Sequence, residues 1–136
     1  LVKLLLDYKG RMVVILAGYT GDMKLFLDTN PGLGSRFTKK IHFDDYKPDE
    51  LSQIFMIAAK KKKYIVPEET KQAVDMQLQF MYDNRDRNFG NARTANNLFE
   101  AVRQAMATRL LQSGDVSAEE MSTILPEDIL KAAEAM

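Results

Sequence analysis

Three times in the second part of the chain, a proline is followed directly by two acidic residues. Proline suits the first turn of a helix because its missing N–H would have no partner there, and carboxylates in that turn complement the positive end of the helix dipole. Each triplet therefore predicts the start of a helix and constrains what the following residues can form. The triplets are Pro48-Asp49-Glu50, Pro67-Glu68-Glu69 and Pro126-Glu127-Asp128.

Behind these starts, and again from Asn91, apolar residues recur at three- and four-residue steps, as they do on the buried face of a helix. Gly114 is a usual C-terminal stop for the long helix that begins at Asn91. We therefore expect a domain of four helices over residues 47–136, with one further turn at Ser117–Glu120. Its buried positions are predicted to be Leu51, Ile54, Phe55, Ala58, Val74, Phe80, Met81, Ala95, Leu98, Phe99, Val102, Met106, Leu110 and Ile129.

Residues 1–46 have a different character and predict a small α/β remnant. The continuous β-branched and apolar run at 12–17 is typical of a strand buried on both faces, and alternation at 39–43 predicts a second strand. Short helices are expected at 1–7 and 20–28. The predicted fold is thus an incomplete α/β domain over 1–46, followed by an all-α domain over 47–136.

The overall composition excludes several functions. Nineteen basic and nineteen acidic residues cancel, so no global charge favours nucleic acid or a membrane surface as a partner. With no cysteine and one histidine, we expect no metal site. The longest apolar run is too short to cross a bilayer. The four lysines at 60–63 are interpreted as a solvated helix end, because no aromatic residue is interleaved with them.

Arg36 is the first candidate functional residue. It follows Asn30-Pro31-Gly32-Leu33-Gly34, whose glycines and proline rule out a regular helix or a central strand. A planar, permanently charged guanidinium on a short stiff loop suits a phosphate or carboxylate. Its partner is either an acidic neighbour on the same chain or an anion outside it.

Arg93 is the second candidate, because it lies in the first turn of the predicted long helix. A cation at the positive end of a helix is mildly unfavourable unless an anion compensates it. That anion is either the acidic loop at 83–86 or a bound phosphate.

Several stretches resemble the second half of an AAA+ ATPase module. They occur in the same order as in the family that includes the red-type Rubisco activase (CbbX) and stage V sporulation protein K. The resemblance covers about residues 1–112. The stretches are Val13-Val14-Ile15-Leu16-Ala17-Gly18-Tyr19, Asp22-Met23, Asn30 to Phe37, and Phe89-Gly90-Asn91-Ala92-Arg93 leading into Asn97-Leu98-Phe99-Glu100.

This resemblance implies a role for each candidate residue. Arg36 stands where the family has an arginine finger, which points across a subunit interface at the neighbour's γ-phosphate. Arg93 stands at sensor 2, an arginine of the lid that contacts phosphate in its own subunit. Sensor 1 follows the first buried strand, where many AAA+ proteins have asparagine. Here Tyr19 and Thr20 stand there, so the choice between their two hydroxyls stays open.

The resemblance also implies a ring, usually a hexamer of identical subunits, that uses ATP and Mg²⁺ to remodel a protein client. A cysteine-free chain is compatible with the cytoplasm or the plastid stroma. However, no Gly-x-x-x-x-Gly-Lys-Ser/Thr phosphate loop occurs, and no apolar strand ends in paired acids suited to magnesium in the family's position.

We therefore expect a C-terminal fragment of an AAA+ ATPase. The parent would hydrolyse ATP, whereas this part alone would neither hydrolyse ATP nor bind it tightly. The chain does not start with methionine and opens in an apolar helix, which favours the same interpretation. The alternative is a stand-alone helical adaptor that binds protein or DNA and has no ATPase activity. The gene sequence upstream of Leu1 discriminates between the two.

Overall fold

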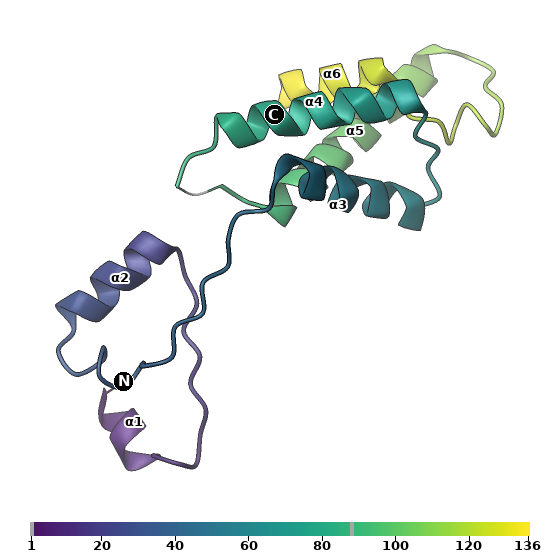
Figure 1. Cartoon of the computed structure of the whole chain (residues 1–136). Helices are drawn as coiled ribbons and strands as arrows, with labels where there is room; N and C mark the ends of the chain where they lie inside the picture. Colours follow the sequence, from purple (N-terminus) through teal and green to yellow (C-terminus); the bar gives the residue numbers. More distant parts are fainter. Residues whose placement is uncertain (1, 88) are drawn as a thin grey trace. The chain divides into compact units, whose positions relative to one another are not determined.

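The structure is a computed structural model that describes residues 2–87 and 89–136. It divides into two units, Leu1–Asp44 and Asp45–Met136, and each is described by itself. The described residues form six α-helices (Figure 1). The first unit holds α1 (Val2–Asp7) and α2 (Thr20–Thr29), and the second holds α3 (Pro48–Lys61), α4 (Glu68–Asp83), α5 (Ala92–Gln112) and α6 (Pro126–Ala135).

The helix starts predicted from the proline–acid triplets are confirmed. Pro48 is the first residue of α3, and the Glu50 carboxylate accepts a hydrogen bond from the Lys47 backbone N–H at 2.8 Å. Pro126 opens α6 in the same way, with Asp128 accepting from the Leu125 N–H at 2.9 Å. Each carboxylate thus satisfies an N–H that has no partner within the helix.

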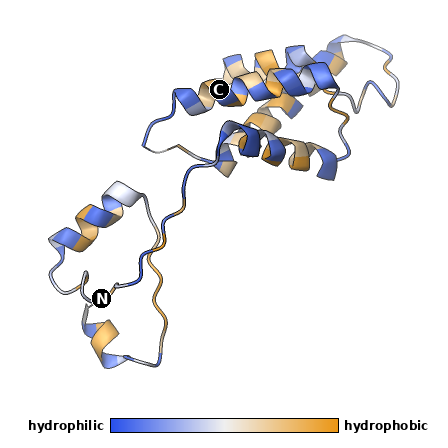
Figure 2. Cartoon of the chain, viewed as in Figure 1, coloured by the Kyte–Doolittle hydropathy of each residue, from blue (hydrophilic) through white to orange (hydrophobic). Residues whose placement is uncertain are grey.

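The four helices of the second unit enclose one apolar core. Helix α3 packs against α4 and α5, and α6 packs against the same two helices. At its centre the Phe55 and Phe99 rings meet edge to face, with centroids 5.4 Å apart. Figure 2 shows the amphipathic character of these helices. The core residues are Leu51, Phe55, Ala59, Val74, Leu78, Ala95, Leu98, Phe99, Val102, Met106, Ile124, Ile129 and Ala132.

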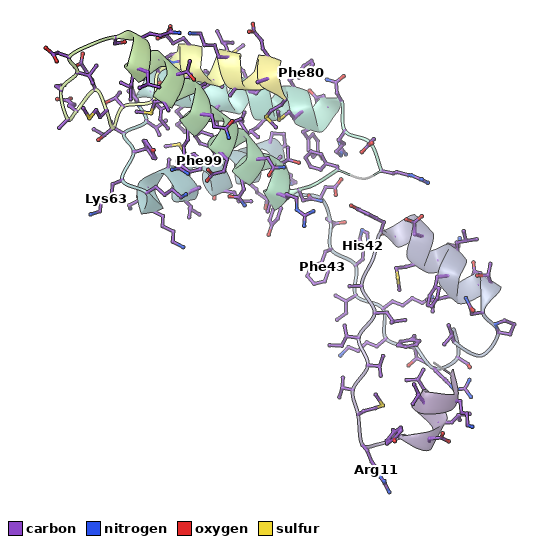
Figure 3. The ribbon with its side chains drawn as sticks, turned by 180° about the vertical axis from the view of Figure 1, so that it is seen from behind. Arg11, His42, Phe43, Lys63, Phe80 and Phe99 are labelled. Atoms are coloured by element: carbon purple, nitrogen blue, oxygen red, sulfur yellow. The ribbon has the colours of Figure 1, made fainter. Side chains whose placement is uncertain are left out.

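One predicted core residue is wrong. Phe80 of α4 is exposed, whereas Phe99 of α5 is buried (Figure 3). Val74 and Leu78 form the buried stripe of α4 and already fill the space beneath it. The spacing of Val74, Phe80 and Met81 therefore gave the existence of the helix but not its inward face.

Backbone hydrogen bonds join the loop between α3 and α4 to the loop between α5 and α6. The Ile65 N–H donates to the Ser122 carbonyl at 2.8 Å, and the Ile124 N–H donates to the Ile65 carbonyl at 3.0 Å. The buried Thr70 hydroxyl donates to the Ile124 carbonyl at 2.7 Å. The predicted turn at Ser117 is also present, with its hydroxyl accepting from the Glu120 N–H. These contacts close the end of the helical domain.

A buried ion pair fixes α6 to α5. Arg109 donates through Nε to Asp128 Oδ1 at 2.9 Å and through Nη2 to Asp128 Oδ2 at 3.0 Å. Its Nη2 also donates to the Thr123 carbonyl. The bond to Asp128 is the main reason why the pKa of Arg109 is raised above its usual value. Asp128 is fully buried, and its carboxylate both caps α6 and holds Arg109.

The prediction of two strands is wrong for the described part of the chain. Residues 12–17 and 39–43 form no strand in the described part of the chain, and Val13 and Ile15 are 88% and 84% exposed. A strand depends on hydrogen bonds to a neighbour, and a strand buried on both faces also needs covering layers. The described residues supply neither, so both segments run as extended chain. The predicted α/β remnant is therefore not confirmed by the structure.

Candidate functional site

Arg36 lies at the end of a compact turn that is bonded within itself. Gly32 has φ +87°, which favours glycine, and Leu33 is 3% exposed. The Leu33 N–H donates to the Asn30 carbonyl at 3.1 Å, and the Arg36 N–H donates to the Leu33 carbonyl at 2.9 Å. The Ser35 hydroxyl donates to the Gly32 carbonyl at 3.1 Å. These bonds restrict where the Arg36 side chain can begin.

The guanidinium of Arg36 is exposed. Its Nη1 donates to the Gly32 carbonyl at 2.7 Å, and a Cβ placed on Gly32 would lie 2.8 Å from the same nitrogen. Gly32 is thus needed for its backbone conformation, whereas the flexible end of Arg36 could move away from an added Cβ. Arg36 forms no ion pair with any residue that the structure describes. The predicted alternative, an acidic partner for Arg36 on the same chain, is therefore not seen among the described residues.

Tyr19 and Thr20 stand at the start of α2. The Tyr19 carbonyl accepts a hydrogen bond from the Met23 N–H at 2.8 Å, and its side chain is exposed. The Thr20 hydroxyl lies 3.3 Å from Nδ1 of His42, whose Nε2 lies 3.2 Å from an Asp44 carboxylate oxygen. Both hydroxyls remain candidates for sensor 1, and Thr20 is the one with a side-chain partner.

Arg93 lies in the first turn of α5, with no acidic residue in that turn. Its side chain is exposed and forms no ion pair among residues 2–87 and 89–136. The predicted alternative, a salt bridge from Arg93 to the loop at 83–86, is thus not present among those residues. Gly90 allows the close approach of this turn, because a Cβ there would lie 3.0 Å from the Thr94 hydroxyl. The turn presents a guanidinium at the positive end of the longest helix of the chain.

Next to Arg93 is a polar cluster that the sequence analysis did not predict. Asp45 accepts hydrogen bonds from Asn91 Nδ2 at 2.9 Å and from Arg85 Nε at 3.1 Å. The Asn91 carbonyl oxygen Oδ1 accepts from the Tyr46 N–H at 2.8 Å. The only sequence signal was the Gly-Asn pair before a helix, which marks a tight turn but does not name the partners of its side chain.

A second polar group lies in an open groove between α3 and α4. The groove has a volume of about 600 Å³, and Ser52, Lys71 and Asp75 contribute to its lining. Burial opposes the ionisation of Asp75, but hydrogen bonds from Lys71 and Ser52 outweigh it and hold the pKa of Asp75 below its usual value. This group fastens α3 to α4.

In the described residues, no group of three or more histidine, cysteine or acidic side chains could hold a metal ion. No helix in the same residues combines the length and apolar character that crossing a membrane requires. Of the candidate residues predicted from the sequence, Arg36 and Arg93 carry exposed guanidiniums, which suit phosphate.

The second unit thus has four helices around one core, with an arginine in the first turn of the third of them. Residues 47–136 match the family model described as the AAA lid domain. The chain is 31% identical over 134 residues to a protein CfxQ homolog of Guillardia theta, covering 97% of this chain and 45% of that protein. The chain therefore belongs to the CbbX-like (CfxQ) family of AAA+ ATPases and contains the C-terminal module of that family.

Other relatives agree with this assignment. Identity is 31% over 135 residues to the ribulose bisphosphate carboxylase/oxygenase activase, chloroplastic, of Cyanidioschyzon merolae, covering 97% of this chain and 45% of that protein. Identity is 35% over 140 residues to the ESX-3 secretion system protein EccA3 of Mycolicibacterium smegmatis, covering 92% of this chain and 23% of that protein. The chain thus spans less than half the length of these relatives. Arg93 lies inside the matched lid, and Arg36, Tyr19 and Thr20 lie before it.

Proposed function

We propose that this chain is the C-terminal part of an AAA+ ATPase that couples ATP hydrolysis to the remodelling of a protein client. In this proposal residues 1–46 complete the large nucleotide-binding subdomain and residues 47–136 are its lid. Family membership and the limited span of the chain support the proposal. The apolar residues left exposed around 12–17 and 39–43 also support it, because they are suited to covering by further strands and helices.

Arg93 is proposed as sensor 2, and its exposure is the observation that carries the functional proposal. The Arg93 guanidinium lies in the first turn of α5 and has no ion-pair partner among the described residues, so it is available for a phosphate oxygen. Binding the γ-phosphate would hold the lid in one position, and hydrolysis would release it. The lid would then rotate as a body, since its core is closed on itself.

Arg36 is proposed as an arginine finger that acts on the nucleotide of a neighbouring subunit. Its self-bonded turn fixes the base of the side chain, and the exposed guanidinium can leave Gly32 for a stronger, charged acceptor. Charge stabilisation of the phosphoryl transition state by such fingers is worth roughly 10³ to 10⁵ in rate. This role requires a homo-oligomeric ring, for which the family's usual hexamer is the proposed state.

The proposed cofactors are ATP and Mg²⁺, held mainly by the rest of the protein. The exposed arginines suit the phosphates of ATP, whereas the described residues offer no ligand set for magnesium. For sensor 1 we retain Tyr19 and Thr20, either of which could orient the attacking water with its hydroxyl. The client is a protein, and the cytoplasm or the plastid stroma is the proposed location, the latter supported by the chloroplastic activase among the relatives.

Nucleotide measurements on Arg93 variants test the proposal. In the full-length ATPase, Arg93→Ala should greatly lower kcat, and Arg93→Lys should recover only part of it, because lysine is a point charge without the planar fork. Arg87→Ala is the matched control, since it removes an exposed arginine from the loop before α5. Unchanged kcat in Arg93→Ala would contradict the role.

Calorimetry on the 136-residue chain is the second test. The chain lacks the phosphate loop, so ATP should bind it no tighter than the millimolar range, near −4 kcal/mol. Low-micromolar affinity would contradict the proposal that the main phosphate contacts lie elsewhere.

A further inference from the structure

Asn91, the residue before α5, has a backbone conformation that residues other than glycine rarely adopt. Its φ of 51° and ψ of −124° are those of the first central residue of a type II′ turn, where glycine is usual. The hydrogen bond of that turn is present, because the Arg93 N–H donates to the Gly90 carbonyl at 3.0 Å. A strained non-glycine residue persists only where its surroundings fix it.

Both polar atoms of the Asn91 side chain contact the segment where the chain enters the lid. Oδ1 accepts a hydrogen bond from the Tyr46 backbone N–H at 2.8 Å, and Nδ2 donates to Asp45 Oδ1 at 2.9 Å. Glycine would suit the backbone of this turn but could form neither bond. The use of the side chain thus explains why a residue other than glycine stands there.

The loop between α4 and α5 also binds the Asp45 carboxylate, through Arg85. Arg85 donates through Nε to Asp45 Oδ2 at 3.1 Å and through Nη1 to the Tyr82 carbonyl at the end of α4. Its guanidinium carbon lies 3.7 Å from the centre of the Tyr82 ring, and the Phe89 ring packs edge to face on Tyr82. Asp45 is therefore fastened to the end of α4 as well as to the start of α5.

We propose that Asn91 is a positioning residue that joins the entering segment, Asp45–Tyr46, to the turn carrying Arg93, so that the two move as one piece. The mechanical meaning rests on the proposed function of Arg93 as sensor 2. A phosphate bound by Arg93 then acts on the entering segment through the Asn91 side chain. Asn91 itself is no phosphate ligand, since both of its polar atoms are engaged.

We call this link of Asn91 to Asp45–Tyr46 the anchor. The Tyr46 amide reports it directly in the 136-residue chain. In Asn91→Gly, which relaxes the backbone and removes both side-chain bonds, exchange of the Tyr46 amide hydrogen should be about tenfold faster. Asn91→Ala removes the same bonds without relaxing the backbone and should show the same acceleration. Amides of the α3 and α5 cores should keep their exchange rates in both variants.

The exchange pattern decides between an anchor and a general structural role. Unchanged protection of Tyr46 in Asn91→Gly would overturn the anchor. A uniform loss of protection over all four lid helices in Asn91→Gly would also overturn it, because that would show a role in the whole fold. Asp45→Asn keeps an acceptor for Asn91 but removes the charge paired with Arg85, and it should accelerate Tyr46 exchange less.

Kinetics of the full-length ATPase separate this inference from the proposed function. Asn91→Gly keeps Arg93, so it should lower kcat several-fold while leaving the Kd of the nucleotide unchanged. A kcat equal to wild type in Asn91→Gly, with Arg93→Ala inactive, would overturn the coupling alone. Wild-type kcat in Arg93→Ala would instead refute the sensor 2 role, and with it the mechanical meaning of the anchor, whereas the Tyr46 exchange result would still test the anchor itself.

Discussion

The two units of the chain differ in what holds them together. The lid buries a continuous set of side chains from all four of its helices, including Phe55 and Phe99, at 0–2% exposure. In the first unit, Leu33 is the only buried side chain among those described, and Phe43 is 85% exposed. One sequence thus contains a domain with its own core and a segment whose apolar residues have no partners in the described structure.

The difference follows from where each element finds its hydrogen bonds. A helix satisfies its backbone internally and needs only to bury one face, which the four lid helices do for each other. An extended segment needs a neighbouring strand for every backbone bond. The lid is therefore specified by its own residues, whereas the runs at 12–17 and 39–43 have no neighbouring strand in the described residues.

Separating the units should produce the largest effect. Residues 45–136 alone should unfold cooperatively with nearly the midpoint of the whole chain, since the core lies entirely within them. Residues 1–44 alone should show no cooperative transition. Thermal unfolding followed by circular dichroism measures both. A cooperative transition in 1–44 would break the contrast between the units.

Two phenylalanines provide the matched comparison. Phe99→Ala removes a ring that is 1% exposed and should lower the unfolding free energy by about 3–5 kcal/mol. Phe43→Ala removes a ring that is 85% exposed and should change it by less than about 0.5 kcal/mol. Denaturant unfolding of the whole chain gives both values. Equal losses would show that Phe43 is buried in solution.

The buried ion pair sharpens the account of the lid. Asp128→Asn leaves a neutral acceptor beside Arg109 and should cost about 1.5–3 kcal/mol, the range for hydrogen bonds to charged groups. Glu127→Gln, whose carboxylate lies 3.6 Å from Arg109 and is half exposed, is the control and should cost far less. Equal costs would contradict the assignment of Asp128 as the main partner.

The smallest expected effect is a pH dependence of the lid. The folded pKa of Asp75 lies below its unfolded value of 3.8, so its contribution to stability is present above that pH and is lost as the pH falls through the folded pKa. Asp75→Asn should therefore make the unfolding free energy of residues 45–136 less sensitive to pH below 4. The effect should be modest, because the side chain is 41% exposed. An unchanged slope would contradict the contribution of Asp75.

The sequence predicted the lid well for a physical reason. Proline, acidic first turns and apolar periodicity act within one helix, so Pro48, Pro126 and the stripe containing Ala95 and Phe99 could be interpreted without knowing the rest of the fold. Phe80 was misplaced, because which of two adjacent faces becomes buried is decided by the neighbouring helices.

The predicted strands and the polar cluster show the limit of the sequence. The run at 12–17 has strand composition, but a strand is a property of a pair, and pairing depends on residues far away in the chain. The bonds of Asn91 to Asp45 and Tyr46 cross about 45 residues and follow no local pattern. Arg36 and Arg93 were candidates from their local sequence context, whereas their roles came from a resemblance and remain predictions.

Mixing two inactive variants tests most directly whether this chain supplies one arginine to its own nucleotide and one to its neighbour's. In the full-length ATPase, Arg36→Ala and Arg93→Ala subunits should each be nearly inactive alone. Combined in equal amounts, an Arg36→Ala subunit keeps its own Arg93 and borrows Arg36 from an Arg93→Ala neighbour. Such interfaces make up about a quarter of a randomly mixed ring, so about a quarter of the wild-type ATPase rate should return. A mixture no more active than either variant alone would contradict the account.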